Sequence, residues 1–288
     1  MRVTVSRTSE STRLHRRRNR FSKASRYAIL AIISATTLYP LYVMINASLR
    51  SDTENATNPA GVAMPPLASS FQELVQRGGL LAFGNSVLVS VIASAGAVFL
   101  CALAGYSLTK LRFRGRNMIF VALLATMMVP VQTAIPGFFS FFAKFGWINS
   151  YQVQILPFIT PVFGLFMIRQ YLLSVPDSLV EAGRLDGAGE FRIFWELIVP
   201  VIRPILSAFG VLQFLAMWNS FIWPQVMASA ANVAPLSIVL PTLTDPVLGI
   251  QPLFGAMMAG SVLMTIPMIV VFFMNQDAFM RGVSYGSK

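Results

Sequence analysis

The sequence is poor in the residues that most catalytic and metal sites require. It contains one cysteine, one histidine and 11 acidic residues among 288. A single cysteine, Cys101, cannot form a disulfide or a cysteine-based metal site within the chain. The one histidine, His15, lies in a basic N-terminal stretch, and no HExxH motif, carboxylate cluster or GxxxxGK[ST] phosphate loop occurs. These absences disfavour a metalloenzyme and a chain that hydrolyses nucleotides itself.

Charge is scarce throughout, and long apolar runs take its place. Charged residues make up 11% of the chain, against about 25% in an average soluble domain, and hydrophobic residues make up 55%. Six runs approach or exceed the roughly 20 apolar residues that a helix needs to cross a bilayer. They are Tyr27–Ser48, Asn85–Thr109, Asn117–Phe139, Tyr151–Met167, Ile205–Met227 and Leu253–Met274. The sequence therefore predicts an all-α membrane protein with six transmembrane helices.

Prolines predict that two of these helices are irregular. Pro130 and Pro136 lie in the third run, and Pro157 and Pro161 lie in the fourth. Proline lacks a backbone N–H and its ring clashes with the preceding turn, so it kinks or breaks a helix.

The basic residues predict the orientation in the membrane, because positively charged loops stay on the cytoplasmic side. They gather in the N-terminal arm, after the second run, after the fourth run and in the tail. These are Arg2, Arg7, Arg13, Arg16, Arg17, Arg18, Arg20, Lys23, Arg26; Lys110, Arg112, Arg114, Arg116; Arg169, Arg184, Arg192, Arg203; and Arg281, Lys288. The other side has Arg50, Arg77 and Lys144. We expect a multi-pass protein of a bacterial inner membrane with both termini cytoplasmic.

This topology also accounts for the net charge of +11. We interpret residues 1–26 as a basic arm at the membrane surface and residues 27–288 as the transmembrane domain, with lipid and not nucleic acid as the arm's partner. The central parts of the six runs contain no Asp, Glu, His, Lys or Arg. Proton relays and ion-coupled carriers use such intramembrane groups, so a partner must supply the energy for any uphill transport.

The loop between the fourth and fifth runs has the pattern of a helical hairpin. Asp177 or Ser178 is suited to cap a first helix, with Ser178 and Glu181 in capping-box spacing, and Gly187 allows a reversal after Asp186. The second helix is predicted to begin at Glu190 and to end at Pro200. Its aromatic and aliphatic residues are expected along one face: Phe191, Phe194, Trp195 and Ile198.

Small residues in this loop allow another surface to approach its backbone closely. They are Ala182, Gly183, Gly187, Ala188 and Gly189, with Arg184, Asp186 and Glu190 as charges at the rim. Two interpretations fit the pattern equally well: a docking site for a protein partner, or an amphipathic segment lying on lipid headgroups.

A longer pattern in the same loop resembles a known family. The residues Glu181, Ala182, Gly183, Asp186, Gly187, Ala188, Leu197, Val199 and Pro200 stand in the spacing of the EAA loop of binding-protein-dependent ABC importer permeases. Gly183, Leu197 and Val199 replace the alanine, isoleucine and leucine that this pattern prefers, which nearly preserves size and apolarity. We call residues 176–200 the EAA loop.

The resemblance covers most of the chain and is closest to the carbohydrate-uptake, MalG-type subgroup. It is carried by NSVLVSVIASAGAVFLCALAGYSLTKLRFRGRN from Asn85, ATMMVPVQTAIPGFF from Ala125, IRQYLLSVPDSLVEAGRLDGA from Ile168, MWNSFIWP from Met217 and MRGV from Met280. It implies a type I (MetI-like) permease bundle with a coupling helix between spans four and five.

The resemblance further implies a complex of two non-identical permease chains, two cytoplasmic ATPase chains and an extracytoplasmic solute-binding protein. ATP and Mg would be bound by the ATPase chains, with no cofactor on this chain. The coupling role would fall to the motif residues Glu181, Ala182, Gly183, Asp186, Gly187 and Ala188. Glu181 is expected to pair with a basic group, and the outer segments Ser51–Leu80 and Ala228–Pro252 to meet the binding protein.

The solute itself is less clearly indicated. Sugar sites combine aromatic faces with neutral hydrogen-bonding groups, and the candidates in or near the spans include Gln132, Gln213, Trp218 and Asn219. Helix packing and interfacial placement explain most of these residues better than a sugar site does. The expected function is ATP-driven import of a sugar or oligosaccharide. A glycerol-phosphate-type or other small polar cargo, an ATP-independent secondary carrier and a membrane enzyme are the alternatives.

Overall fold

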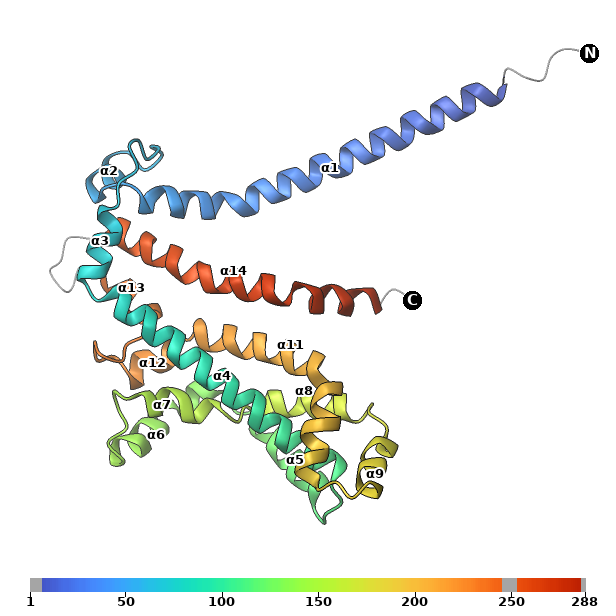
Figure 1. Cartoon of the computed structure of the whole chain (residues 1–288). Coiled ribbons are helices and arrows are strands. Elements are labelled where there is room, and N and C mark those ends of the chain that lie inside the picture. Colours follow the sequence, from blue (N-terminus) through green and yellow to red (C-terminus); the bar gives the residue numbers. More distant parts are fainter. Residues whose placement is uncertain (1–6, 245–252, 286–288) are drawn as a thin grey trace, which may run out of the picture.

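The structure is a computed structural model that describes residues 7–244 and 253–285, and every regular element in these ranges is helical (Figure 1). The longer elements are α1 (Arg7–Ser48), α4 (Gly79–Lys110), α5 (Arg116–Thr126), α6 (Val131–Lys144), α8 (Val162–Leu172), α11 (Val199–Trp218) and α14 (Phe254–Tyr285). The shorter ones are α2 (Asp52–Thr57), α3 (Ser69–Gln76), α7 (Tyr151–Ile155), α9 (Asp177–Leu185), α10 (Glu190–Arg192), α12 (Ile222–Met227) and α13 (Leu236–Thr242).

The prediction of an all-helical membrane protein is confirmed. The described residues contain five helical stretches long and apolar enough to cross a membrane, or six if the bent pair α5 and α6 forms one span. The five are Arg26–Ser48, Gly79–Lys110, Tyr151–Leu172, Glu190–Trp218 and Phe254–Asn275. The predicted boundary at residue 26 lies inside α1, which is continuous from Arg7.

The third and fourth runs are broken, as their prolines predict. Helices α5 and α6 meet at 97°, and Pro130 stands at the N-cap of α6 with an extended backbone. In the fourth run, Pro157 lies in a 3-10 turn, η1 (Leu156–Phe158), and Pro161 caps α8. Pro136 lies inside α6 without ending it.

The predicted bounds of the fifth span are wrong at both ends. The helical stretch begins at Glu190, passes through a π-helical turn, η2 (Ile193–Ile198), and continues as α11. Pro200 does not stop it but lies inside the continuous stretch, directly after the π-helical turn, where the α-helical hydrogen-bond pattern is already interrupted. The stretch ends at Trp218, and α12 is a separate short helix.

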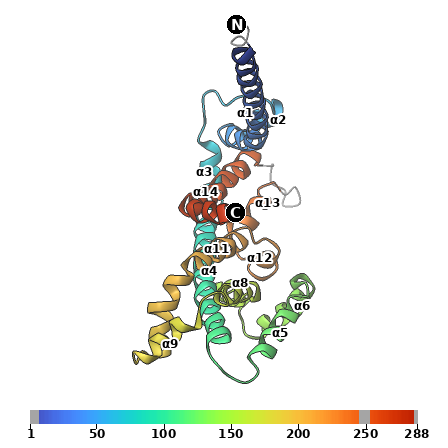
Figure 2. The same cartoon turned by 90° about the vertical axis from the view of Figure 1, so that its right-hand side faces the viewer.

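Helix α4 is the centre of the bundle. It packs against α8 and α11, and the largest buried cluster joins these three helices to the EAA loop through Tyr106, Ile168, Phe194 and Phe209. The approach of α8 to α11 requires Gly164, because a Cβ at that position would overlap the ring of Phe209. Figure 2 shows α5 and α6 on one side of α4 and α9 on the other.

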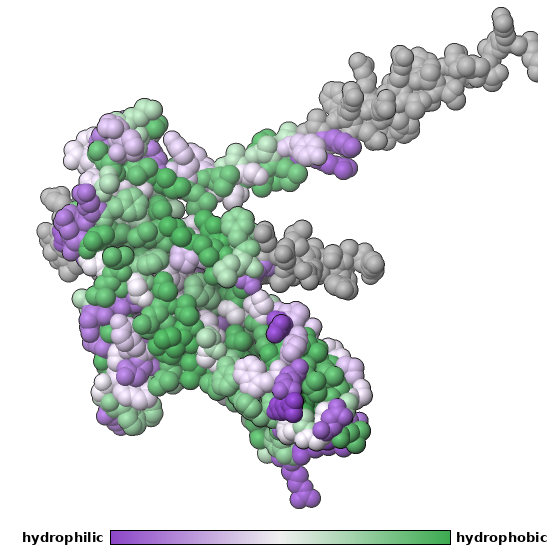
Figure 3. Space-filling view, in the orientation of Figure 1, coloured by the Kyte–Doolittle hydropathy of each residue, from purple (hydrophilic) through white to green (hydrophobic). Residues whose placement is uncertain are grey.

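The hydrophilic residues collect at two opposite margins. Helices α2, α3 and α13 lie at one margin, and α9 and the outer ends of α1 and α14 lie toward the opposite one (Figure 1). A broad hydrophobic surface separates hydrophilic patches at the two margins (Figure 3). Helix α1 packs against α14, and its span window contains no buried residue, so its apolar side chains face outward from this chain.

Candidate functional site: the EAA loop

The first half of the EAA loop is a short helix closed by a tight reversal. Helix α9 begins at Asp177 after Pro176, and its C-cap is Asp186. Gly187 has φ +77°, its N–H donates to the Arg184 carbonyl over 3.1 Å, and the Ala188 N–H donates to the Gly183 carbonyl over 3.0 Å. These are the two hydrogen bonds of a Schellman motif, which needs a left-handed residue where Gly187 stands. The predicted reversal at Gly187 is confirmed.

The predicted capping box at Ser178 and Glu181 is wrong. No side chain caps α9, because the helix starts one residue earlier, behind Pro176. Proline's fixed φ suits a helix start, and the Asp177 carboxylate is engaged elsewhere. A complete capping box occurs instead at α2, between Ser51 and Glu54.

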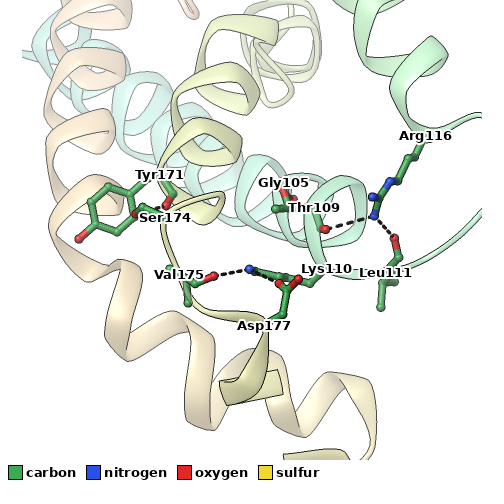
Figure 4. Close-up of polar contacts among 9 residues, drawn as sticks. All are labelled: Gly105, Thr109, Lys110, Leu111, Arg116, Tyr171, Ser174, Val175 and Asp177. Carbon is green, nitrogen blue, oxygen red and sulfur yellow. Dashed lines mark hydrogen bonds and ion pairs between the residues drawn. The ribbon is translucent and has the colours of Figure 1, made fainter. Parts of the chain in front are cut away.

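The Asp177 carboxylate binds the last residue of α4. Lys110 Nζ donates to Asp177 Oδ1 over 2.6 Å and to the Val175 carbonyl over 2.5 Å (Figure 4). The Lys110 side chain is 3% exposed, whereas that of Asp177 is 70% exposed. The hydrogen bond and the positive charge of Lys110 lower the pKa of Asp177 below its ordinary value. A charged contact therefore ties the start of α9 to the end of α4.

A second polar contact lies at the start of α10. Glu190 accepts hydrogen bonds from Tyr106 Oη over 2.6 Å and from Arg184 Nε over 2.7 Å. The hydrogen bond to Glu190 raises the pKa of Arg184 above its ordinary value. Glu190 thus connects three elements, α4, α9 and α10, at one carboxylate.

The second half of the loop does not have the single apolar face that the sequence predicts. Phe194 and Ile198 are buried with Ile193, whereas Phe191 and Trp195 are exposed. The prediction assumed 3.6 residues per turn, but η2 is a π-helix, whose wider turn separates positions that an α-helix would align.

The predicted coupling residues divide into an exposed and an inward-facing group. Glu181, Ala182, Asp186 and Gly187 are exposed. Gly183 is buried, and a Cβ there would lie 2.8 Å from Leu197 Cδ1, so its small size serves packing within this chain. Ala188 packs partly against the main core. The ion pairs among the described residues do not include Glu181.

Sequence reasoning missed two exposed apolar side chains on the hairpin. Leu185 is 89% exposed and Phe191 is 64% exposed, one on each side of the Gly187 reversal. The exposure of Leu185 could have been predicted from the sequence, since an apolar residue next to Asp186 at a helix end is often exposed to solvent. The exposure of Phe191 could not have been predicted, because the α-helical period assigned this residue to the buried face.

The four candidate solute residues do not form a cluster of free polar groups. Gln213 and Trp218 are buried, and they donate to the carbonyls of Phe158 over 3.1 Å and Met264 over 3.0 Å. Asn219 is exposed and donates to the Leu215 carbonyl one turn earlier. Gln132 lies exposed at the start of α6.

The margin formed by α2, α3 and α13 has its own network of neutral hydrogen bonds. Asn85 donates to the carbonyls of Asn232 and Ala234 and accepts from Tyr151 Oη over 2.8 Å. Gln154 donates to the Val233 carbonyl over 3.0 Å. Side chains of α4 and α7 thereby hold the segment before α13 in place. The rest of the predicted outer surface, residues 245–252, lies outside the described residues, as does the end of the tail.

Taken together, the described residues form a multi-pass helical bundle of a membrane protein, with the helical hairpin of the EAA loop exposed at one polar margin. The chain belongs to the binding-protein-dependent transport system inner membrane component family, whose model matches residues 97–285. It is accordingly a multi-pass inner-membrane permease of an ABC importer, a transport subunit without a catalytic site of its own. This membership implies an ATPase and a solute-binding protein as partners.

Several curated relatives are similar over nearly their whole length. The arabinooligosaccharides transport permease AraQ of Halalkalibacterium halodurans is 32% identical, covering 89% of this chain and 92% of the relative. The lactose transport permease LacG of Rhizobium radiobacter is 27% identical, covering 92% and 96%. The sn-glycerol-3-phosphate transport permease UgpE of Yersinia enterocolitica is 28% identical, covering 89% and 94%.

A solved structure has the same fold. It is a bacterial ABC transporter involved in import of the acidic polysaccharide alginate, and one of its chains matches with a TM-score of 0.77 at 22% identity. The match covers 91% of this chain and 97% of that one.

Proposed function

We propose that this permease imports a sugar or oligosaccharide, delivered by an extracytoplasmic binding protein, as one of two non-identical permease subunits. The named cargoes of the relatives support this proposal, since arabinooligosaccharides and lactose are neutral sugars. The uncharged central parts of the spans support it as well, because recognition of a phosphate generally uses arginine or lysine. The glycerol-3-phosphate relative makes a phosphorylated cargo the second candidate.

The EAA loop is proposed as the site that couples this chain to an ATPase subunit, which would bind ATP and Mg. The observation that carries this assignment is the exposed hairpin, in which Leu185 and Phe191 face outward while Gly187 fixes the reversal. An isolated hairpin with two large apolar side chains in water gains stability when a partner groove covers them. Glu181 and Asp186 supply charges beside these side chains, and a basic group on the ATPase is the partner we propose for Glu181.

Two further assignments follow from the arrangement of the helices. The outward ends of α1 and α14 lie toward the same margin as the EAA loop (Figure 1), which supports placing both termini in the cytoplasm. The span of α1 has no buried residue in its apolar window. A second permease chain covering part of that surface fits the proposed heterodimer.

The decisive experiment is purification of the complex through a tag on the N-terminal arm, followed by mass spectrometry of the co-purified chains. We expect an ATPase and a second permease in stoichiometric amounts. Hydrolysis would then be measured in vesicles with the binding protein and either arabinooligosaccharide, lactose or sn-glycerol 3-phosphate. Stimulation by a neutral sugar supports the proposed cargo, and stimulation by glycerol 3-phosphate alone overturns it. Recovery of the chain without an ATPase would contradict the coupling assignment.

A further inference from the structure

We infer that Lys110 and Tyr106 are positioning residues that carry movement of the EAA loop directly into α4. The inference rests on the proposed coupling role of the loop. It assigns to α4 a part that the motif residues alone do not give it, because neither Lys110 nor Tyr106 belongs to the EAA pattern.

Chain connectivity alone joins the loop to two other helices. The EAA loop follows α8 and leads into α11, so these two helices must respond when it moves. Helix α4 is remote in sequence, since the residue numbers of Lys110 and Asp177 differ by 67 and those of Tyr106 and Glu190 by 84. Its link to the loop consists of side-chain contacts.

The two polar contacts fall at different places along the hairpin. Lys110 holds the start of α9 through Asp177 and Val175, and Tyr106 holds the start of α10 through Glu190. A single contact would leave the hairpin free to pivot about it, whereas two contacts allow rotation only about the line that joins them. Arg184 binds the same Glu190 carboxylate, so α9 and α10 are held to each other as well.

Burial makes the Lys110 contact hard to release. Its side chain is almost fully covered, and a covered ammonium group is stable only while it keeps its hydrogen-bonding partners. Separation of α9 from α4 would leave that charge without them. Apolar packing adds to the same interface, since the ring centroids of Tyr106 and Phe194 lie 5.5 Å apart and Val180 is buried in the shared cluster. The loop and the end of α4 therefore form one rigid unit.

The test measures this rigidity and its effect on coupling separately. In a Cys101→Ala background, spin labels are placed at Ser107 on α4 and at exposed Ser178 on α9, and their separation is measured by dipolar EPR in the reconstituted complex. We expect the same narrow distribution of label-to-label distances without nucleotide and with trapped ATP. Lys110→Met should broaden this distribution. The amount of solute transported per ATP hydrolysed should fall about tenfold, as for loss of a charged hydrogen bond.

Matched variants separate this role from a general effect on folding. Lys144→Met makes the same substitution at an exposed lysine at the end of α6 and should leave separation and transport unchanged. Tyr106→Phe removes one hydroxyl and should lower the transport ratio less than Lys110→Met, whereas Lys110→Arg should restore most of it.

Two results would overturn the inference: a label separation that changes between the nucleotide states in the unmodified pair, or an unchanged transport ratio in Lys110→Met. Failure of the proposed function can be distinguished from failure of this inference, because no ATPase would associate with the chain if the proposed function were wrong. The label separation in the chain alone would still report whether Lys110 holds α9.

Discussion

The indole N–H of Trp218 donates to the Met264 carbonyl over 3.0 Å, which joins the end of α11 to the middle of α14. Trp218 is 1% exposed, so this hydrogen bond is shielded from water. A residue that sequence reasoning places on the solute path thus has a visible packing role.

Substitution of Trp218 by phenylalanine should test the two roles. The change keeps an aromatic ring but leaves the Met264 carbonyl without its donor, which costs about 1–3 kcal/mol for a buried group. We expect a lower thermal unfolding midpoint in detergent and an unchanged KM for solute. Asn219→Ala, at the exposed neighbour, should leave the midpoint unchanged. A raised KM with normal stability in Trp218→Phe would instead place this residue on the solute path.

Gly187 should tolerate few side chains. Its φ of +77° lies in the left-handed region, where an L-residue costs roughly 1–2 kcal/mol and a β-branched one more. We expect Gly187→Val to weaken co-purification of the ATPase or to uncouple its hydrolysis, with membrane insertion intact. Gly187→Asn should be milder, because asparagine adopts this conformation more readily.

The matched control for this prediction is Gly189→Ala. Gly189 has φ −70° and open space around a Cβ, so alanine should be accepted with a smaller loss than any side chain at Gly187. Normal transport by Gly187→Val would show that the reversal does not position the coupling surface.

The exposed Leu185 should contribute to ATPase binding. Burial of a leucine side chain contributes about 1.5–3 kcal/mol, so Leu185→Ser should raise the dissociation constant of the purified ATPase for the reconstituted permease roughly tenfold or more. Leu173→Ser, at an exposed leucine before the hairpin, provides the control. Equal effects of the two substitutions would argue against a specific groove for Leu185.

The contact between Lys110 and Asp177 should weaken only in acid. Lys110 lowers the pKa of Asp177, so the carboxylate is favoured in the folded state. The stability that this provides is present above the unfolded pKa of about 3.9 and is lost as the pH falls through the lower folded pKa. The difference in unfolding midpoint between the unmodified chain and Lys110→Met should therefore be constant from about pH 5 to 8 and shrink below about pH 4. A difference that shrinks near neutrality would show that another group titrates there.

Packing between α8 and α11 should fail when Gly164 gains a side chain. A Cβ there overlaps the Phe209 ring, whereas a Cβ at Gly137 meets no atom within 4 Å. Overpacking of a core costs about 1–3 kcal/mol. We expect Gly164→Ala to lower the unfolding midpoint and Gly137→Ala to leave it unchanged, and equal midpoints would mean that α8 and α11 separate easily.

The membrane fold was largely predictable because its signals are local. Runs of apolar residues give the spans, and Pro130, Pro157 and Pro161 mark the breaks, since proline's effect on a helix depends on its immediate neighbours. Gly187 likewise indicated a reversal of the chain, because glycine readily adopts a positive φ.

The contacts of the EAA loop were less predictable because they depend on residues far away in sequence. No residue near Asp177 in the sequence indicates that Lys110 will bind its carboxylate. Because of this ion pair, the Asp177 side chain does not cap α9. The start of the fifth span was misplaced because η2 carries the helix through Pro200. Recognition of the motif located the loop, but the inward packing of Gly183 becomes visible only when Leu197 is placed beside it.

The π-helical turn of η2 absorbs one extra residue at the root of the hairpin. A π-turn holds one residue more than the α-helical turn it replaces. Deleting one residue between Gly189 and Val199 would therefore let η2 relax to a regular α-helix while Leu185 and Phe191 kept their direction. The same deletion within a regular turn of α11 would instead rotate the hairpin by about 100° around the helix axis. Relatives that are one residue shorter at this junction should therefore present the hairpin to their partners at the same angle.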